Sequence, residues 1–197
     1  MNIDIPVGEQ PKRRRKWKKE LFSWLKIITM ITIFVVFVRM FLFTNYIVYG
    51  QSMMPTIADG ERVIVNKIGY EISEPERFDL IIFHATEDTD YIKRVIGLPG
   101  EHVKYENDML YVNGEPIEEP FLKPGSNGYD SDEVFTKDFT LESKTGEMIV
   151  PDGHVFVLGD NRRNSMDSRQ MGFVEQDVIV GKVNVAYWPP KKLRVFH

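Results

Sequence analysis

Hydrophobic and polar positions divide the chain into two parts with different periodicities. Residues Leu21–Phe43 form an apolar run of 23 residues, which spans roughly 34 Å as a helix. A hydrocarbon core is about 30 Å thick, so this run is long enough for one transmembrane helix. Lys26 and Arg39 interrupt the run, each close enough to an end for its long side chain to reach the membrane interface. The pattern predicts a single membrane-spanning segment at residues 21–43.

After Phe43 the pattern changes to short runs rich in Val, Ile, Tyr and Phe, bounded by Gly, Pro, Asn and Asp. Such runs are typical of strands joined by turns. The expected strands are Tyr46–Tyr49, Arg62–Asn66, Leu80–Phe83, Tyr91–Ile96, His102–Tyr105, Met109–Val112, Val155–Leu158 and Val178–Tyr187. Asn113-Gly114 after one of these runs predicts a type I′ hairpin turn. No long 3.6-residue period follows, so the expected fold class is mainly β, with an N-terminal transmembrane helix before a β-rich domain.

One stretch of the β-rich part differs from its flanks. Residues Glu115–Glu147 are more polar and contain several Pro and Gly residues, which indicates turns and loops. We therefore expect residues 44–197 to form one domain with a small inserted β subdomain at about residues 101–148.

The charge distribution predicts how the chain is oriented. Residues 1–43 carry nine Lys and Arg against three Asp and Glu, a net charge of +6, whereas residues 44–197 carry −10. The basic run Lys12–Lys19 directly precedes the apolar segment, and such a flank stays on the cytoplasmic side. Residues 1–20 are thus predicted to be a cytoplasmic arm and residues 44–197 to lie outside. An acidic body also argues against nucleic acid as a partner.

The apolar segment has a second interpretation. Its uncharged part, Ile27–Val38, also suits the h-region of a cleavable secretory signal. Such a signal needs small residues at its cleavage site, but the three alanines, Ala58, Ala85 and Ala186, all lie beyond Phe43. This favours an uncleaved signal anchor over a cleaved leader, and either of these over a buried helix of a soluble protein.

Composition limits the possible chemistry. The chain has no cysteine, which excludes disulfides, thiolate metal sites and cysteine nucleophiles. His84, His102, His154 and His197 are scattered without ligand spacing, so we expect no metal site and no cofactor. A Ser-His-Asp triad stays open, because all three residue types are present.

Two residues lie where nucleophilic chemistry is plausible. Ser52 follows an apolar strand within Gly50–Thr56, where a turn exposes a hydroxyl and main-chain N–H groups, as a nucleophile and an oxyanion hole require. Lys93 lies in an alternating strand. If it shares a face with Val95, burial lowers its pKa and makes a neutral amine available as a general base. The alternatives are an ordinary turn serine and a surface lysine on an edge strand.

A third candidate is the polar, turn-forming run Gly159–Arg169, which follows a strand that looks buried. Asp167 and Arg169 are able to clamp this run by ion pairing, and Ser165 is able to hydrogen-bond a nearby amine. The alternative is a solvated loop.

In this order, these elements resemble the type I signal peptidases, the serine–lysine leader peptidases of bacterial membranes. The likeness is to the short single-anchor form typical of Gram-positive bacteria. Four blocks after Ile27 carry it: the anchor with Gly50–Thr56, Arg62–Phe83, Tyr91–Gly100 (YIKRVIGLPG) and Gly159–Arg169 (GDNRRNSMDSR). Four blocks in order at suitable spacing are specific, whereas residues Glu115–Glu147 carry little of the resemblance.

The resemblance implies a membrane-bound serine endopeptidase that removes signal peptides from secreted preproteins with small residues at positions −1 and −3. By likeness to the family motifs, Ser52 is the nucleophile and Lys93 the general base, with Ser165 orienting the lysine amine. Supporting positions are Asp160, Asp167, Arg169 and Gly50. Residues implied to contact substrate are Tyr46, Val48, Met53, Ile57 and Ile92. The implied partners are these signal peptides and the lipid bilayer.

Two positions depart from the family pattern, and three rival interpretations stay open. Gly50 stands where some members carry Ser or Thr as a second oxyanion donor, and Phe78 precedes Asp79 where Gly-Asp is common. The rivals are a Ser–Lys autoprotease of the repressor kind, a non-enzymatic tethered β domain, and an intact peptidase dedicated to few clients. The repressor kind carries a DNA-binding domain where this chain has an anchor.

Overall fold

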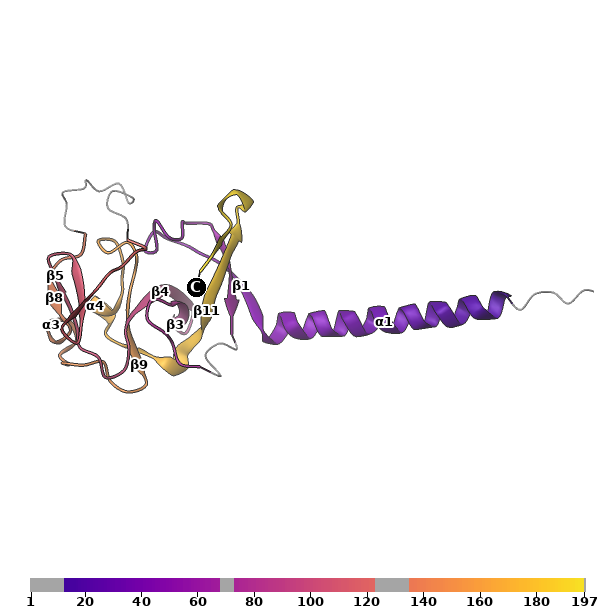
Figure 1. Cartoon of the computed structure of the whole chain (residues 1–197), viewed down its shortest axis with the longest axis horizontal. Coiled ribbons are helices and arrows are strands. Elements are labelled where there is room, and N and C mark those ends of the chain that lie inside the picture. The colour runs from indigo at the N-terminus through magenta and orange to yellow at the C-terminus, as the bar shows by residue number, and fades with distance from the viewer. Residues whose placement is uncertain (1–12, 68–72, 123–134, 197) are drawn as a thin grey trace, which may run out of the picture. The chain divides into compact units, whose positions relative to one another are not determined.

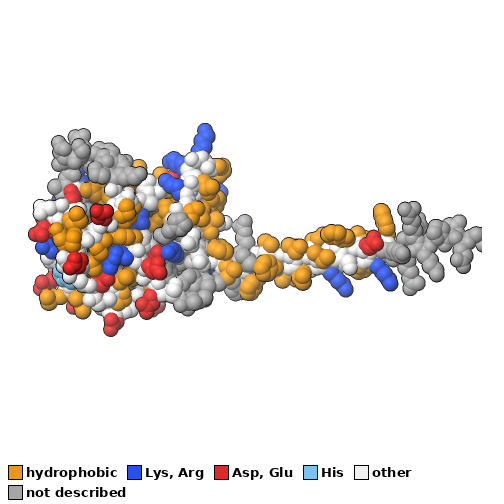
Figure 2. Space-filling model, in the orientation of Figure 1, with side chains coloured by type: hydrophobic (Ala, Val, Ile, Leu, Met, Phe, Trp, Pro, Cys, Tyr) orange, Lys and Arg blue, Asp and Glu red, His pale blue; other side chains and the backbone are white. Residues whose placement is uncertain are grey.

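The computed structural model describes residues 13–67, 73–122 and 135–196. These residues fall into two units, Met1–Phe41 and Leu42–His197, which we treat separately. In the first unit, helix α1 runs over Arg13–Phe41. Its part at Lys19–Phe37 is long and apolar enough to cross a membrane, and the described side chains there are exposed. Figure 2 shows hydrophobic side chains along this helix, with basic ones toward its N-terminal end.

The second unit is built mainly from antiparallel strands (Figure 1). The larger sheet contains β1 (Phe43–Ile47), β2 (Arg62–Asn66), β3 (Leu80–Thr86), β4 (Thr89–Gly97), β9 (His154–Leu158), β10 (Val174–Glu175), β11 (Ile179–Trp188) and β12 (Arg194–Val195). Its strand order is β1-β2-β11-β3-β4-β9-β10, and β12 pairs with β11. Short helical segments are α4 (Ser168–Met171), η1 (Gln176–Val178) and η2 (Pro190–Lys192).

A smaller sheet is inserted between β4 and β9. It contains β5 (Val103–Glu106), β6 (Met109–Val112), β7 (Glu115–Ile117) and β8 (Phe139–Thr140), in the order β7-β6-β5-β8, and is followed by helix α3 (Leu141–Thr145). The expected tight turn joins β6 to β7, and Asn113 and Gly114 have positive φ values of 51° and 87°, as a type I′ turn requires. All of these elements lie within residues 101–148.

Three clusters of buried side chains hold the second unit together. Val63, Val65 and Ile82 belong to one cluster on the larger sheet, and a second includes Ile81 and Val95. The third combines residues of both sheets, among them Ile96, Phe156, Val103, Leu110 and Phe139. The inserted sheet therefore packs against the larger sheet through an apolar interface, which is the main favourable contribution to such a contact.

The fold class expected from the sequence, mainly β after an apolar N-terminal helix, is confirmed. Several element boundaries were wrong, and two of them lie at the ends of β1. The helix ends at Phe41, and Phe43 already belongs to β1, because it pairs with Asn66 of β2. The same strand ends at Ile47, so Val48 and Tyr49 lie in the turn that leads to Ser52. The helix also begins within the basic run, and residues 1–12 of the predicted arm lie outside the described residues.

Candidate active site

The side chains of Ser52 and Lys93 meet at the surface of the second unit. Ser52 lies in the irregular turn after β1, and Lys93 lies in the middle of β4. The distance between Lys93 Nζ and Ser52 Oγ is 3.0 Å, which is within hydrogen-bonding range. A nucleophile and a base need this spacing for direct proton transfer.

Lys93 is buried even though its side chain is cationic at its ordinary pKa. Only 3 % of the residue is exposed. Val95, two positions further along the strand, and Ile81, directly opposite on β3, are also buried. Nζ donates a second hydrogen bond to the carbonyl of Ile92 at 3.0 Å. Loss of hydration dominates and lowers the pKa of Lys93 from 10.5 to about 8, although the carboxylates of Asp167 and Asp160 oppose this.

The loop after β9 connects the two segments that carry these side chains. The main-chain N–H of Asn161 donates to the carbonyl of Ser52 at 2.9 Å, and its side-chain amide donates to the carbonyl of Gln51 at 3.0 Å. The neighbouring Asp160 accepts two hydrogen bonds from Arg94, at 2.8 and 2.6 Å. Since Arg94 is adjacent to Lys93, residues 160 and 161 tie the loop to both halves of the pair.

Asp167 holds the other end of the same loop. Its carboxylate binds Arg169 through Nε and Nη2, both at 2.8 Å, and accepts the N–H of Gly159 at 3.1 Å. It also caps the N-terminus of α4 by accepting the N–H of Arg169. Four acceptor contacts hold this buried side chain in a fixed position, so Asp167 and Arg169 form a loop clamp.

Ser165 lies next to the pair without a hydrogen bond to the lysine. A Cβ built on Gly159 would lie 2.2 Å from Ser165 Oγ and 2.5 Å from the Ser52 carbonyl oxygen, so these three residues are closely packed. Within the described part of the chain, Ser165 Oγ is buried and has no hydrogen-bond partner. Position 159 requires glycine, because any side chain there would clash with Ser165 and with the main chain of Ser52.

A groove of about 550 Å³ opens beside Ser52 and Lys93. Of the five residues implied to contact substrate, Tyr46, Val48 and Ile92 line it. Met53 and Ile57 are instead almost completely buried, and they pack in the same core cluster as Val48 and Ile92. The structure thus places these two side chains within the core rather than in the groove wall. Burial of large apolar side chains next to an active site stabilises its walls.

Several residues at this site were missed from sequence. Gly50, which the sequence had marked, also lines the groove. The other lining residues are Ile47, Tyr49, Gln51, Ile82, Asp88, Thr89, Asp90, Tyr91, Asn164 and Met166. The hydroxyl of Tyr46 bonds Asp90 across the groove, and burial and this carboxylate together raise the pKa of Tyr46 to about 12. Asn161 lies within the polar run Gly159–Arg169 but was not singled out there. Nothing in the strand pattern around Asp90 marked it as a partner of Tyr46.

The two departures from the family pattern have a clear backbone context. Gly50 has a φ of +90°, and its N–H donates to Asp59 at 2.7 Å. Phe78 has a φ of +73°, a conformation in which glycine is the least strained residue. Its carbonyl accepts a hydrogen bond from Arg94 Nη1 at 2.9 Å. Glycine before the aspartate would adopt this left-handed conformation with less strain, whereas this chain adopts it with Phe78.

A β-rich domain that presents a serine hydroxyl beside a buried lysine amine has the side-chain arrangement of the serine–lysine hydrolases. The sequence model of one protein family, described as "Signal peptidase, peptidase S26", matches residues 21–188 of this chain. The chain belongs to this family.

Individual relatives agree with this assignment. Signal peptidase I of Bacillus caldolyticus is 48 % identical over 184 residues, which cover 93 % of this chain and 96 % of the relative. Signal peptidase IB of Staphylococcus aureus (strain Mu50) is 43 % identical over 176 residues, 87 % and 92 % of the two chains. A crystal structure of signal peptidase I from Enterococcus faecalis V583 shares 44 % identity, with a TM-score of 0.52. It matches 56 % of this chain and 97 % of that one.

Proposed function

We propose that this chain is a membrane-anchored signal peptidase that cleaves signal peptides from preproteins with Ser52 as nucleophile and Lys93 as general base. The observation that carries the proposal is the 3.0 Å contact between Ser52 Oγ and the amine of a buried lysine. A pKa of about 8 for Lys93 gives a useful fraction of neutral amine near neutral pH. The family to which the chain belongs supports the substrate class.

The first half of the reaction forms an acyl-enzyme. Neutral Lys93 takes the proton of the Ser52 hydroxyl as Oγ attacks the carbonyl carbon of the scissile peptide bond. The N–H of Ser52 donates to the resulting oxyanion. The Lys93 ammonium then protonates the departing amine, which leaves as the new N-terminus of the mature protein. The signal peptide stays attached to Ser52 as an ester.

The second half restores the enzyme. Neutral Lys93 now takes a proton from water as the oxygen of that water attacks the ester carbonyl. The tetrahedral intermediate collapses, Ser52 Oγ recovers a proton from the ammonium, and the signal peptide leaves with a free carboxylate. A single base thus serves both halves, because Lys93 gives up its proton at the end of each half and returns to the neutral form.

The groove and the helix support the finer parts of the proposal. Tyr46, Val48 and Ile92 form part of an apolar wall beside the pair, which suits short apolar side chains such as the small residues at positions −1 and −3. The apolar part of α1 and the basic residues before it support an orientation in which the second unit lies on the outer face of the membrane.

Cleavage of a purified preprotein tests the chemistry. We expect the full chain in detergent to release the mature protein and its Ser52→Ala variant to release none. Ser168→Ala is the matched control, because Ser168 is a buried serine whose hydroxyl accepts the N–H of Val157 away from the pair. Undiminished cleavage by Ser52→Ala would exclude the proposed nucleophile.

Protease added to intact protoplasts tests the topology. We expect digestion of residues 44–197 and survival of a short N-terminal fragment that the membrane and cytoplasm protect. Complete protection of the second unit would reverse the proposed orientation and, with it, the access to exported preproteins.

A further inference from the structure

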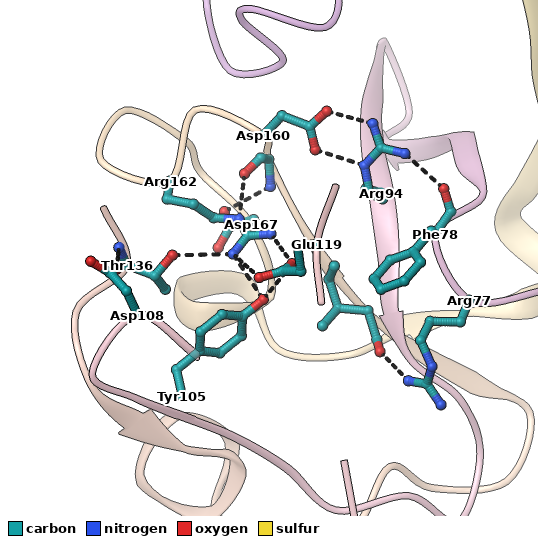
Figure 3. Close-up of polar contacts among 12 residues, drawn as sticks. Arg77, Phe78, Arg94, Tyr105, Asp108, Glu119, Thr136, Asp160, Arg162 and Asp167 are labelled. Atoms are coloured by element: carbon teal, nitrogen blue, oxygen red, sulfur yellow. Dashed lines mark hydrogen bonds and ion pairs between the residues drawn. The ribbon is translucent and has the colours of Figure 1, made fainter. Parts of the chain in front are cut away.

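Arg162 connects the active-site loop with the inserted sheet. Its side chain is fully buried and lies among residues that come from outside the loop (Figure 3). Nη1 donates to the Tyr105 hydroxyl at 2.8 Å and to Thr136 Oγ1 at 3.1 Å, and Nη2 binds Glu119 Oε1 at 2.5 Å. Tyr105 also donates to Glu119 at 2.8 Å. The mechanism above uses none of these groups.

The partners of Arg162 belong to the inserted subdomain. Tyr105 lies on β5, and Glu119 follows β7. Thr136 precedes β8, and its main-chain N–H binds the carboxylate of Asp108 in the β5–β6 turn at 2.5 Å. Burial raises the pKa of Tyr105, so that its hydroxyl stays protonated and available as a donor. The cluster is thus a closed set of paired polar groups rather than a solvated surface.

The other side of Arg162 acts on the loop that holds the catalytic pair. Its Nε donates to the carbonyl of Gly159 at 3.1 Å, and its own carbonyl accepts a bond from Arg169 at 2.6 Å. Between these points lie Asp160, which binds Arg94, and Asn161, which binds the main chain of residues 51 and 52. A four-residue segment therefore joins the inserted sheet to both halves of the pair.

We propose that Tyr105 and Glu119 are positioning residues for peptide cleavage, which act through Arg162 to fix the segment 159–162 and thereby the contact between Ser52 and Lys93. The inserted sheet then has a catalytic purpose, although it contributes no group to the groove. This inference rests on the proposed function.

Energetics favour positioning over simple stabilisation. A buried ion pair is often no more stable than well-packed apolar side chains of the same volume, so stability alone gives little reason for this cluster. Its geometry is specific, because the planar guanidinium uses all three nitrogens at once. Without the Glu119 charge, the guanidinium cannot become neutral. It must shift toward another acceptor or toward water, and the Gly159 carbonyl would follow.

The test uses the full chain in detergent with a purified preprotein, at a temperature where every variant is folded. We expect Glu119→Gln and Tyr105→Phe, which keep side-chain size, to lower kcat about tenfold with little change in KM, as for a misplaced catalytic group. Glu106→Gln is the control, because Glu106 is a neighbour on β5 whose exposed carboxylate pairs only with Lys104 among the described residues. It should keep the parental kcat.

The pH profile separates positioning from loss of stability. In Glu119→Gln the negative charge that compensates the buried Arg162 is lost, and the more positive surroundings disfavour the ammonium form of Lys93. The acid limb of kcat should therefore move to lower pH, and Glu119→Asp, which keeps the charge, should restore it. If Glu119→Gln only lowered the Tm, the acid limb of its kcat would stay at the same pH as in the parent.

The outcomes distinguish this inference from the proposed function. If the parent cleaves the preprotein and Ser52→Ala does not, the proposed function stands. Parental kcat in both Glu119→Gln and Tyr105→Phe, with a parental acid limb in Glu119→Gln, would then overturn the positioning role. Should Glu119→Gln fail to fold, Tyr105→Phe decides the question by its kcat, measured together with KM.

Discussion

Two buried cations in this molecule have opposite environments. The amine of Lys93 makes hydrogen bonds to two neutral oxygens, those of Ser52 and the Ile92 carbonyl, and its pKa falls to about 8. The guanidinium of Arg162 binds the carboxylate of Glu119, and its pKa is raised, because nearby anionic and phenolic groups outweigh the effect of burial. One cation is prepared to lose its proton, and the other is held in its charged form.

The arginines around the pair explain how Lys93 is left without an ion-pair partner among the residues that the structure describes. The two carboxylates near enough to raise the pKa of Lys93 are Asp160 and Asp167. Arg94 binds the first and Arg169 binds the second, each through two nitrogens. Because arginine is never deprotonated, it occupies these carboxylates permanently. The comparison indicates that burial yields a base only where other cations have already taken the nearby anions.

Lys93→Arg gives the largest expected effect. It keeps a positive charge at the position but removes the group able to lose a proton, so cleavage should fall by at least about 10³-fold. The measurement is initial-rate preprotein cleavage, and the control is Lys104→Arg, an exposed lysine on β5. Appreciable activity of Lys93→Arg would point to another base. His84, which lies 2.6 Å from Asp90 at the groove, would be examined first.

Replacing each cation by methionine should change stability in opposite directions. Arg162→Met leaves Glu119 buried without its partner and should lower the free energy of unfolding by about 3–5 kcal/mol. Lys93→Met removes a cation that burial disfavours, and a pKa lowered from 10.5 to about 8 corresponds to a gain of about 3 kcal/mol at neutral pH. Thermal unfolding of the full chain in detergent measures both.

The size of the Lys93→Met effect also depends on pH. Below pH 8 the lysine is protonated in the folded and the unfolded chain, so the full burial penalty applies. Between about 8 and 10.5 the unfolded chain binds more protons, and the parent becomes more stable as pH rises. The gain from Lys93→Met should therefore shrink over this range. A gain that grows with pH would mean that the folded-state pKa of Lys93 is not lowered.

The sequence predicted the local chemistry better than the long-range partners. The alternation around Lys93 was enough to pose the question of a buried amine, and the turn signals around Ser52 marked an exposed hydroxyl. Both depend on near neighbours in the chain. The contact of Arg162 with Glu119, 43 positions apart, depends on how two sheets pack. Arg162 lies in the polar run Gly159–Arg169, but nothing in that run marks Glu119 as its partner.

The same distinction explains the errors in element boundaries and groove residues. Phe43 is as apolar as the helix residues before it, so the local pattern assigns it to the helix. It belongs to β1 instead, because it pairs with Asn66 of β2. Met53 and Ile57 follow the serine closely in sequence, yet the turn directs them into the core with Val63. Apolar character alone does not separate a membrane residue, a groove wall and a core residue.

The pH dependence of the parent is the next largest effect. Since only neutral Lys93 accepts the proton of Ser52, kcat should rise about tenfold per pH unit at low pH and level off above the pKa of about 8. Asp160→Asn removes one of the carboxylates that raise this pKa, so its acid limb should move to lower pH. The cleavage rate across a series of buffers of different pH measures the acid limb of the parent and that of Asp160→Asn. A limb near pH 10 would show that Lys93 keeps its ordinary pKa.

The smallest expected effect concerns Gly50, at the edge of the oxyanion site. Its φ of +90° costs any other residue about 1 kcal/mol or more, whereas a Cβ there meets nothing within 4 Å. Gly50→Ala and Gly50→Ser share this strain, and only serine adds a hydroxyl donor. A well-placed donor to an oxyanion contributes about 10²–10³ in rate. Because the serine is free to rotate in open space, we expect only a several-fold higher kcat for Gly50→Ser than for Gly50→Ala, compared at equal folded fractions. Equal kcat values would mean that the hydroxyl does not reach the oxyanion and that main-chain donors already complete the site.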